Sequence, residues 1–122
     1  MPRAQPRRYP RMARVNEVVR ETLADEVERL SDPKLGFVTL TGVEVSPDLR
    51  HATVFYSVLG AEEQHAETRQ ALHRARRHLR AVLGREVRLK YLPELVFRED
   101  PAIAQGQRVE EIIRSLHKEE DA

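Results

Sequence analysis

Basic side chains concentrate in two segments of this chain, where they could bind the phosphates of a nucleic acid. Residues 69–90 hold seven Arg, Lys90 and a single acid, Glu86, which gives the segment a charge of +7. Residues 1–14 hold five Arg and no acid, and the other 86 residues carry −11, so the net charge of +1 hides a strong segregation. Because nearby acids are too few to neutralise it, the basic stretch favours a polyanionic ligand over a solvated helix face with internal ion pairs.

The spacing of these residues predicts one continuous RNA-facing surface. Arg76 and Arg80 are one helical turn apart with Arg77 beside them, and Arg88 and Lys90 alternate along the polar side of a predicted strand. Such a surface can follow a phosphate backbone. We expect it to consist of Arg74, Arg76, Arg77, Arg80, Arg85, Arg88 and Lys90, extended by Arg7, Arg8, Arg11 and Arg14 when RNA is bound.

Few aromatic side chains are available to stack on bases, which argues against a platform of the RRM type. Tyr91 is a candidate by its place in the basic segment. Its alternation with Val87 and Leu89, however, favours a position in the core.

Enzymatic, metal and cofactor chemistry find little support. The absence of cysteine excludes thiolate catalysis, disulfides and cysteine zinc sites. The five Gly form neither a phosphate-binding loop nor a dinucleotide fingerprint, and the five His show no zinc-binding spacing. Ser46, Asp48 and His51 lie too close together in one predicted turn to stack as a catalytic triad. We therefore expect no enzyme, no cofactor and no metal.

Three segments with period-two alternation predict a sheet. Residues 37–45 and 52–59 flank Ser46-Pro47-Asp48, whose turn chemistry predicts an antiparallel hairpin. Residues 87–97 form the third predicted strand, and Pro93 within it indicates an edge strand or a bend. A right-handed crossover would lay this strand parallel to 52–59. The expected order is first, second, third, with the helices on one face.

Helical spacing predicts the remaining elements. A helix is expected over residues 14–30, and a helical stretch over 61–83 with Gly84 as its C-terminal cap. That stretch is long for a domain of this size, so we expect two helices that meet near Ala75, although no Gly or Pro marks a break there.

The chain divides into three parts. We expect a flexible basic arm over residues 1–13, an RNA-binding domain over 14–100, and a short C-terminal helix with an acidic tail over 101–122. The chain has no apolar run that could span a bilayer and no apolar signal segment. These features predict a cytoplasmic protein with no membrane contact, and we expect a monomer.

Two long motifs resemble the ribosome-binding factor A family. The first runs from Asp32 to Gly60 and contains Gly-Phe-Val-Thr-Leu-Thr-Gly-Val-Glu-Val-Ser-Pro-Asp-Leu-Arg. The second is Leu83-Gly-Arg-Glu-Val-Arg-Leu-Lys-Tyr-Leu-Pro-Glu-Leu-Val-Phe97. The segments Arg-Val-Asn-Glu-Val-Val-Arg and Arg-Val-Glu-Glu-Ile-Ile-Arg-Ser-Leu also fit, so the resemblance covers nearly the whole chain past residue 10.

The resemblance implies an α+β, type II KH-like fold of order α-β-β-α-α-β with a three-stranded mixed sheet, plus the short C-terminal helix. It also implies a non-enzymatic factor that binds the immature small ribosomal subunit and its ribosomal RNA. Such a factor assists late maturation and rRNA processing and supports cold adaptation. Its release is linked to a ribosome-associated GTPase.

One position departs from the family pattern. The family bends between its helices at Ala-x-Gly, whereas this chain has Ala75-Arg76-Arg77. Arg77 cannot take a positive φ cheaply, so the bend is either shallower here or built on helical backbone. The rival to RNA binding is a protein-interaction module whose basic face docks an acidic partner.

Overall fold

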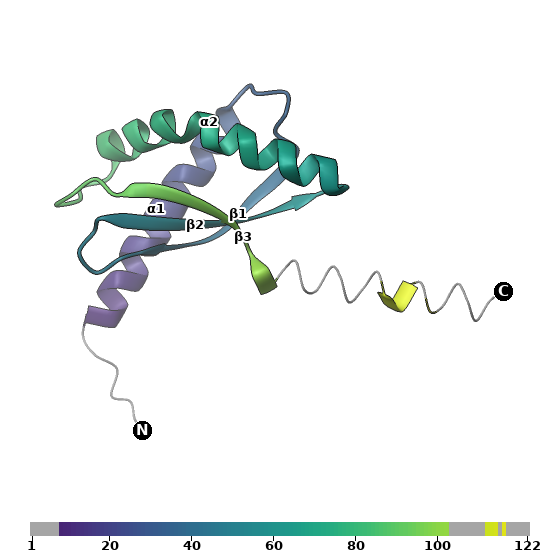
Figure 1. Cartoon of the computed structure of the whole chain (residues 1–122). Helices are drawn as coiled ribbons and strands as arrows, with labels where there is room; N and C mark the ends of the chain where they lie inside the picture. The colour runs from purple at the N-terminus through teal and green to yellow at the C-terminus, as the bar shows by residue number, and fades with distance from the viewer. Residues whose placement is uncertain (1–7, 103–111, 115, 117–122) are drawn as a thin grey trace.

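The structure, a computed structural model, describes residues 8–102, 112–114 and 116, and packs two long helices against a sheet (Figure 1). Helix α1 (Arg8–Arg29) precedes strands β1 (Phe37–Val45) and β2 (His51–Leu59), and helix α2 (Glu62–Glu86) leads to strand β3 (Glu94–Glu99). The sheet order is β1-β2-β3, with β1 antiparallel and β3 parallel to β2. The predicted α+β class, mixed sheet and strand order are confirmed.

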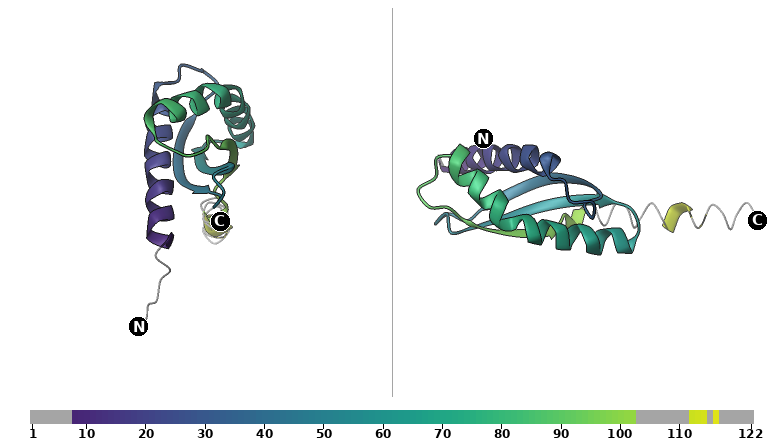
Figure 2. Two further views of the ribbon diagram at one scale, coloured as in Figure 1. Left: turned by 90° about the vertical axis from the view of Figure 1, so that its left-hand side faces the viewer. Right: turned by 90° about the horizontal axis from the view of Figure 1, so that it is seen from above.

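The core lies between the sheet and both helices, which cover the same face of the sheet (Figure 2). Side chains at every third or fourth position of each helix point inward, as an amphipathic helix requires. The helical contributors are Val19, Leu23, Val27, Leu72, Leu79 and Leu83. They meet the inward side chains of the sheet, which are Leu40, Val43, Val45, Ala52, Val54, Tyr56 and Leu95.

A β-bulge in β1 decides which of its side chains face the core. The pairing with β2 shifts between Leu40 and Gly42, so Thr41 is an extra residue on β1. The buried positions accordingly change from even to odd, with Leu40 before the bulge and Val43 and Val45 after it. An unbroken period of two would have turned one of these groups to solvent.

The third strand begins at Glu94, so its predicted start at residue 87 is wrong. A parallel strand can pair only where its neighbour is extended, and β2 begins at His51, which is aligned with Glu94. The Glu94 N–H donates to the Arg50 carbonyl at 2.9 Å, at the first rung of this ladder. Residues 87–93 therefore form a loop, and Pro93 stands just before an edge strand, as its missing donor favours.

The helical stretch after β2 is a single helix, so the break expected near Ala75 is absent. Helix α2 is continuous from Glu62 to Glu86. Arg77 keeps helical backbone, and Leu49 is the only non-glycine residue with positive φ in the described part of the chain. The ribbon of α2 instead changes direction along its length (Figure 2). Without the family glycine, the bend becomes curvature within one helix.

The end of α2 also differs from the prediction, because Gly84 remains helical and does not cap the helix. The Val87 N–H donates to the Leu83 carbonyl at 3.0 Å, three residues later than the predicted stop. A Cβ on Gly84 would lie 3.2 Å from Leu92 Cδ2. The missing side chain therefore lets the loop of residues 87–93 approach the helix closely.

Helix α1 begins at Arg8, so the flexible arm predicted over residues 1–13 is wrong for residues 8–13. Met12 and Val15 pack against the core, which favours extension of the helix toward the N-terminus. Residues 1–7 and most of the predicted C-terminal helix and acidic tail lie outside the described residues. In the part of the chain that is described, no helix is both long and apolar enough to cross a membrane.

Candidate nucleic-acid interface

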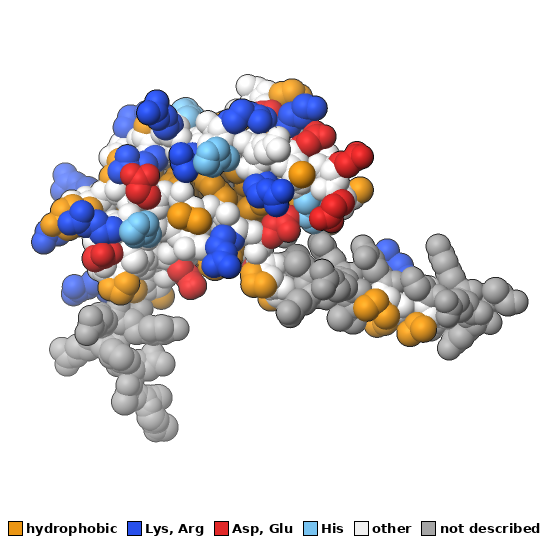
Figure 3. Space-filling model, in the orientation of Figure 1, with side chains coloured by type: hydrophobic (Ala, Val, Ile, Leu, Met, Phe, Trp, Pro, Cys, Tyr) orange, Lys and Arg blue, Asp and Glu red, His pale blue; other side chains and the backbone are white. Residues whose placement is uncertain are grey.

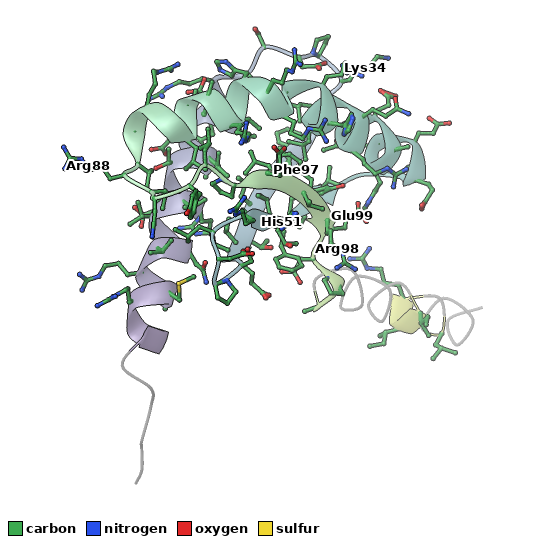
Figure 4. All side chains as sticks on the ribbon, turned by 60° about the vertical axis from the view of Figure 1, so that its left-hand side comes forward. Lys34, His51, Arg88, Phe97, Arg98 and Glu99 are labelled. Atoms are coloured by element: carbon green, nitrogen blue, oxygen red, sulfur yellow. The ribbon has the colours of Figure 1, made fainter. Side chains whose placement is uncertain are left out.

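One flank of α2 overhangs the free edge of β3 and forms a groove with it. Arg69, His73 and Arg76 recur every three or four residues, so they share the helical wall of this groove. The strand wall consists of Leu95, Val96 and Phe97. The cavity measures about 240 Å³, and Figure 4 places Phe97 on the strand beneath the helix. We call these six residues the α2–β3 groove; none of them is acidic.

A wider pocket lies one helical turn further along α2. It measures about 620 Å³ and is enclosed by α2, the turn between β1 and β2, and the segment that leads into β3. Its lining residues are Asp48, Arg50, His51, Arg80, Leu92 and Glu94. We call it the turn–loop pocket. Arg80 follows Arg76 by one turn, so groove and pocket adjoin. Figure 3 shows Lys, Arg and His side chains along α2 on this face, while Asp and Glu gather at its N-terminal end.

Arg80 holds the loop of residues 87–93 in place. Its Nε donates to the Pro93 carbonyl at 3.0 Å, and its Nη2 donates to the Leu92 carbonyl at 2.9 Å. Nη2 also lies 3.4 Å from Glu94 Oε2. The guanidinium fork satisfies two carbonyls that no strand neighbour reaches, so this predicted RNA contact has a structural role.

Arg74 and Arg85 lie on the opposite flank of α2 from the groove. The Arg74 Nη2 atom donates to Asp32 Oδ2 at 2.9 Å, in the connection between α1 and β1. Arg85 is eleven residues further on, about 20° round the helix axis from Arg74, and is exposed. The single surface predicted from the sequence is therefore divided between two flanks.

Carboxylates on the Arg74 flank already have cationic partners. The Lys34 N–H and then Arg74 lower the pKa of Asp32 by hydrogen bonding to its ionised form. On α1, the pKa of Glu26 is lowered first by the hydrogen bond with His78 and then by Arg29. The Glu26–His78 distance is 2.6 Å. This flank is thus paired internally, in contrast to the α2–β3 groove.

The other predicted cations of α2 and the following loop are exposed. Arg77 lies on the outer surface of α2, between the two flanks. Arg88 projects from the loop into solvent (Figure 4). Lys90 is exposed as well, with its Nζ 5.7 Å from the centroid of the Tyr91 ring. Arg88 and Lys90 lie on the loop and not on the face of a strand as predicted.

The N-terminal arginines begin α1 at the same end of the molecule as the turn–loop pocket. The Asn16 side chain accepts a hydrogen bond from the Val45 N–H at 2.9 Å, which fixes α1 beside the turn. Arg11 and Arg14 are exposed in the preceding turns of α1. Arg8 begins the helix, and Arg7 lies outside the described residues.

Tyr91 is at the surface, so its predicted place in the core is wrong. Its side chain is 44% exposed, and the Arg50 Cζ atom lies 4.7 Å from the ring centroid. The alternation with Val87 and Leu89 predicts burial only in a strand, where side chains point to two faces in turn, and residues 87–93 form a loop. Arg50 was missed by the sequence reasoning, because its place at the exit of a predicted turn gives no sign of a contact with a residue far along the chain.

Ser46, Asp48 and His51 form a hydrogen-bonded turn. The Ser46 hydroxyl donates to Asp48 Oδ1 at 2.7 Å, and the backbone N–H of His51 donates to the same hydroxyl at 3.0 Å. The hydroxyl lowers the pKa of Asp48, with a further contribution from the Arg50 N–H. These bonds rigidify the turn and leave no activated nucleophile. Among the described residues, no group of His and carboxylates could hold a metal ion.

Comparisons with known proteins agree on one family. A family model described as ribosome-binding factor A matches residues 11–113. A curated ribosome-binding factor A from Halothermothrix orenii is 38% identical over 113 residues, covering 92% of this chain and 93% of that protein.

Solved structures give the same result. The crystal structure of ribosome-binding factor A from Thermus thermophilus has a TM-score of 0.66 and 34% identity, covering 72% of this chain and 94% of that one. A homology model of the Thermus thermophilus factor, fitted into the cryo-EM map of a 30S–RbfA complex, has a TM-score of 0.58 and 35% identity. It covers 70% of this chain and 91% of that one.

Proposed function

This chain belongs to the ribosome-binding factor A family, and from that premise we propose that it binds the small ribosomal subunit through its ribosomal RNA. The observation that carries the proposal is the α2–β3 groove. Three of its six lining residues are Arg or His, and none is acidic. A groove of this kind attracts phosphates, because its lining holds cations and no carboxylate.

The exposed cations outside the groove extend the proposed surface. Arg77, Arg88 and Lys90 stand on the helix and the loop beside the turn–loop pocket, and Arg11 and Arg14 stand at the same end of the molecule. We propose that these five residues add phosphate contacts around the groove. Arg80 acts by holding the loop, and Arg74 and Arg85 belong to the internally paired flank.

The resemblance of the sequence motifs supports the finer part of the proposal. The protein would act in the cytoplasm as a monomer on the immature small subunit, assist late maturation and rRNA processing, and support growth in the cold. A ribosome-associated GTPase would promote its release. The protein itself would be a binding factor and not an enzyme.

Sedimentation of a cell extract tests this function. The protein should travel with free small subunits and not with complete ribosomes, and its amount in that fraction should fall steeply as salt increases. Nuclease treatment of the purified complex should release it. Association that survives nuclease would support the alternative, in which the basic face docks an acidic protein. Absence from the small-subunit fraction would refute the proposed function.

A further inference from the structure

We propose that the turn–loop pocket receives the base of one unpaired nucleotide, which stacks on the pair formed by Arg50, a lining residue of the pocket, and the neighbouring Tyr91 ring. This inference rests on the proposed function and names the part of the RNA that this end of the interface recognises. The basic segment alone offered Tyr91 as a stacking candidate, but Tyr91 and Arg50 come together only in the folded chain.

Tyr91 offers an aromatic surface that is already arranged for stacking. Tyr91 is 44% exposed, and Arg50 Cζ lies 4.7 Å and Lys90 Nζ 5.7 Å from its ring centroid. The guanidinium and the phenol ring are both planar, so a nucleobase can stack on the guanidinium or on the ring. Arg50 lines the pocket as well as covering the ring, so it joins the two parts of the site.

The walls of the pocket suit the edge of a base better than a phosphate. Two guanidinium groups, from Arg50 and Arg80, are balanced by two carboxylates, from Asp48 and Glu94, and His51 stands beside them. Two positive and two negative formal charges leave the pocket little net charge to attract an anion. The pocket can instead accept from exocyclic amino groups and donate to ring nitrogens and carbonyl oxygens.

The site is fixed before RNA arrives. Arg80 holds the carbonyls of Leu92 and Pro93, directly after Tyr91. On the other side, the Arg50 N–H donates to Asp48 Oδ1 at 3.1 Å, and the Arg50 carbonyl accepts from the Glu94 N–H. Both components of the stack therefore lie on braced backbone, which lowers the entropic cost of binding.

The surroundings provide places for the neighbouring phosphates. Lys90 precedes Tyr91 in the exposed loop, and Arg88 projects from the same loop. In the other direction, Arg80 adjoins Arg76 and the α2–β3 groove. A single strand can thus leave its base in the pocket while its backbone continues along α2. A base held in a continuous duplex cannot enter, so the ligand is unpaired RNA.

The test uses short single-stranded oligoribonucleotides of A, C, G or U, together with purified small subunits. Tyr91→Phe keeps the ring and should bind the oligoribonucleotides within about two-fold of the unmodified protein. Tyr91→Leu removes the ring and should weaken binding by roughly 5- to 100-fold. Oligoribonucleotides that carry 5-iodouridine should photo-cross-link to Tyr91, as mapped by mass spectrometry. Thermal unfolding should show that both variants fold, because the side chain is half-exposed in a loop.

Equal affinity of Tyr91→Leu and the unmodified protein for the oligoribonucleotides would overturn the proposed nucleotide site. Cross-links that map outside residues 87–93 and 48–51 would do the same. So would an unmodified protein that binds small subunits but no oligoribonucleotide; in that case the proposed function stands and the nucleotide site falls. An unmodified protein that binds neither ligand refutes both. The cross-link needs no substitution, so the proposal remains testable even if Tyr91→Leu unfolds.

Discussion

Replacing Arg69 and Arg76 with Gln should flatten the salt dependence of binding to small subunits. Both side chains line the α2–β3 groove, whose six lining residues include no acid. Arg74 and Arg85 provide a matched control, because Arg74→Gln with Arg85→Gln removes the same charge from the same helix. Arg74 is paired with Asp32, and both control residues lie on the other flank.

The size of the effect follows from counterion release. Each phosphate contact contributes about 0.7–0.9 to the slope of log affinity against log salt, so losing two contacts should reduce the slope by about 1.4–1.8. Because the electrostatic contribution nearly vanishes at about 1 M salt, the same change corresponds to a roughly 25- to 60-fold loss at about 0.1 M. The binding free energy then weakens by about 2–2.5 kcal/mol. The control pair should leave the slope nearly unchanged.

The assay is sedimentation binding of each variant to small subunits at several salt concentrations. Thermal unfolding of the same preparations checks that the side-chain changes leave the fold intact, as expected for substitutions outside the core. If both double variants flatten the slope equally, the groove has no special role and binding depends on overall charge alone. If only the control pair flattens it, RNA lies on the flank that faces α1.

Three further predictions concern stability. Gly60 has φ 131° and its added Cβ would lie 2.9 Å from the Gln64 side chain, so Gly60→Ala should cost about 1–3 kcal/mol in urea unfolding. The Cβ added by Gly42→Ala meets no atom within 4 Å, so this substitution should leave stability nearly unchanged. Similar losses of stability in the two variants would contradict the backbone strain inferred at Gly60. Arg80→Lys should release the carbonyls of Leu92 and Pro93, lower the free energy of unfolding by about 1–2 kcal/mol and speed amide exchange in residues 87–92. Unchanged exchange would show that the loop does not depend on the Arg80 guanidinium. Because the pKa of Glu26 is lowered in the fold, its contribution is present above its ordinary pKa of 4.5 and lost as pH falls through the folded value. Glu26→Gln should therefore flatten the acid side of the pH–stability curve, and parallel curves would contradict this assignment.

The periodic segments could be predicted from sequence because their signals are local. Alternation over 37–45 and 52–59, with Ser46 and Asp48 between them, was sufficient for the hairpin, and Pro93 correctly marked an edge strand. The helix after β2 was located correctly but not its end. Gly84 is a good cap in isolation, yet here it is the place where Leu92 approaches the helix.

The length of β3 and the faces of β1 depended on pairing between distant residues. Residues 87–92 have a strand-like pattern, but β2 begins only at His51, so no neighbour exists for them to pair with. The bulge at Thr41 likewise arises from the register with β2, and it reverses the inward side of β1 without any local sign.

The sequence alone determined that this protein has a basic segment on an amphipathic helix and a small mixed sheet, since charge and periodicity are properties of the chain itself. Only the tertiary structure decided which cations act together. Packing of Leu72, Leu79 and Leu83 against the sheet sets the rotation of α2, and that rotation turns Arg76 toward β3 and Arg74 toward Asp32. The pairing of Arg50 with Tyr91, far apart in the chain, depends on where β2 and β3 begin, which no local pattern specifies.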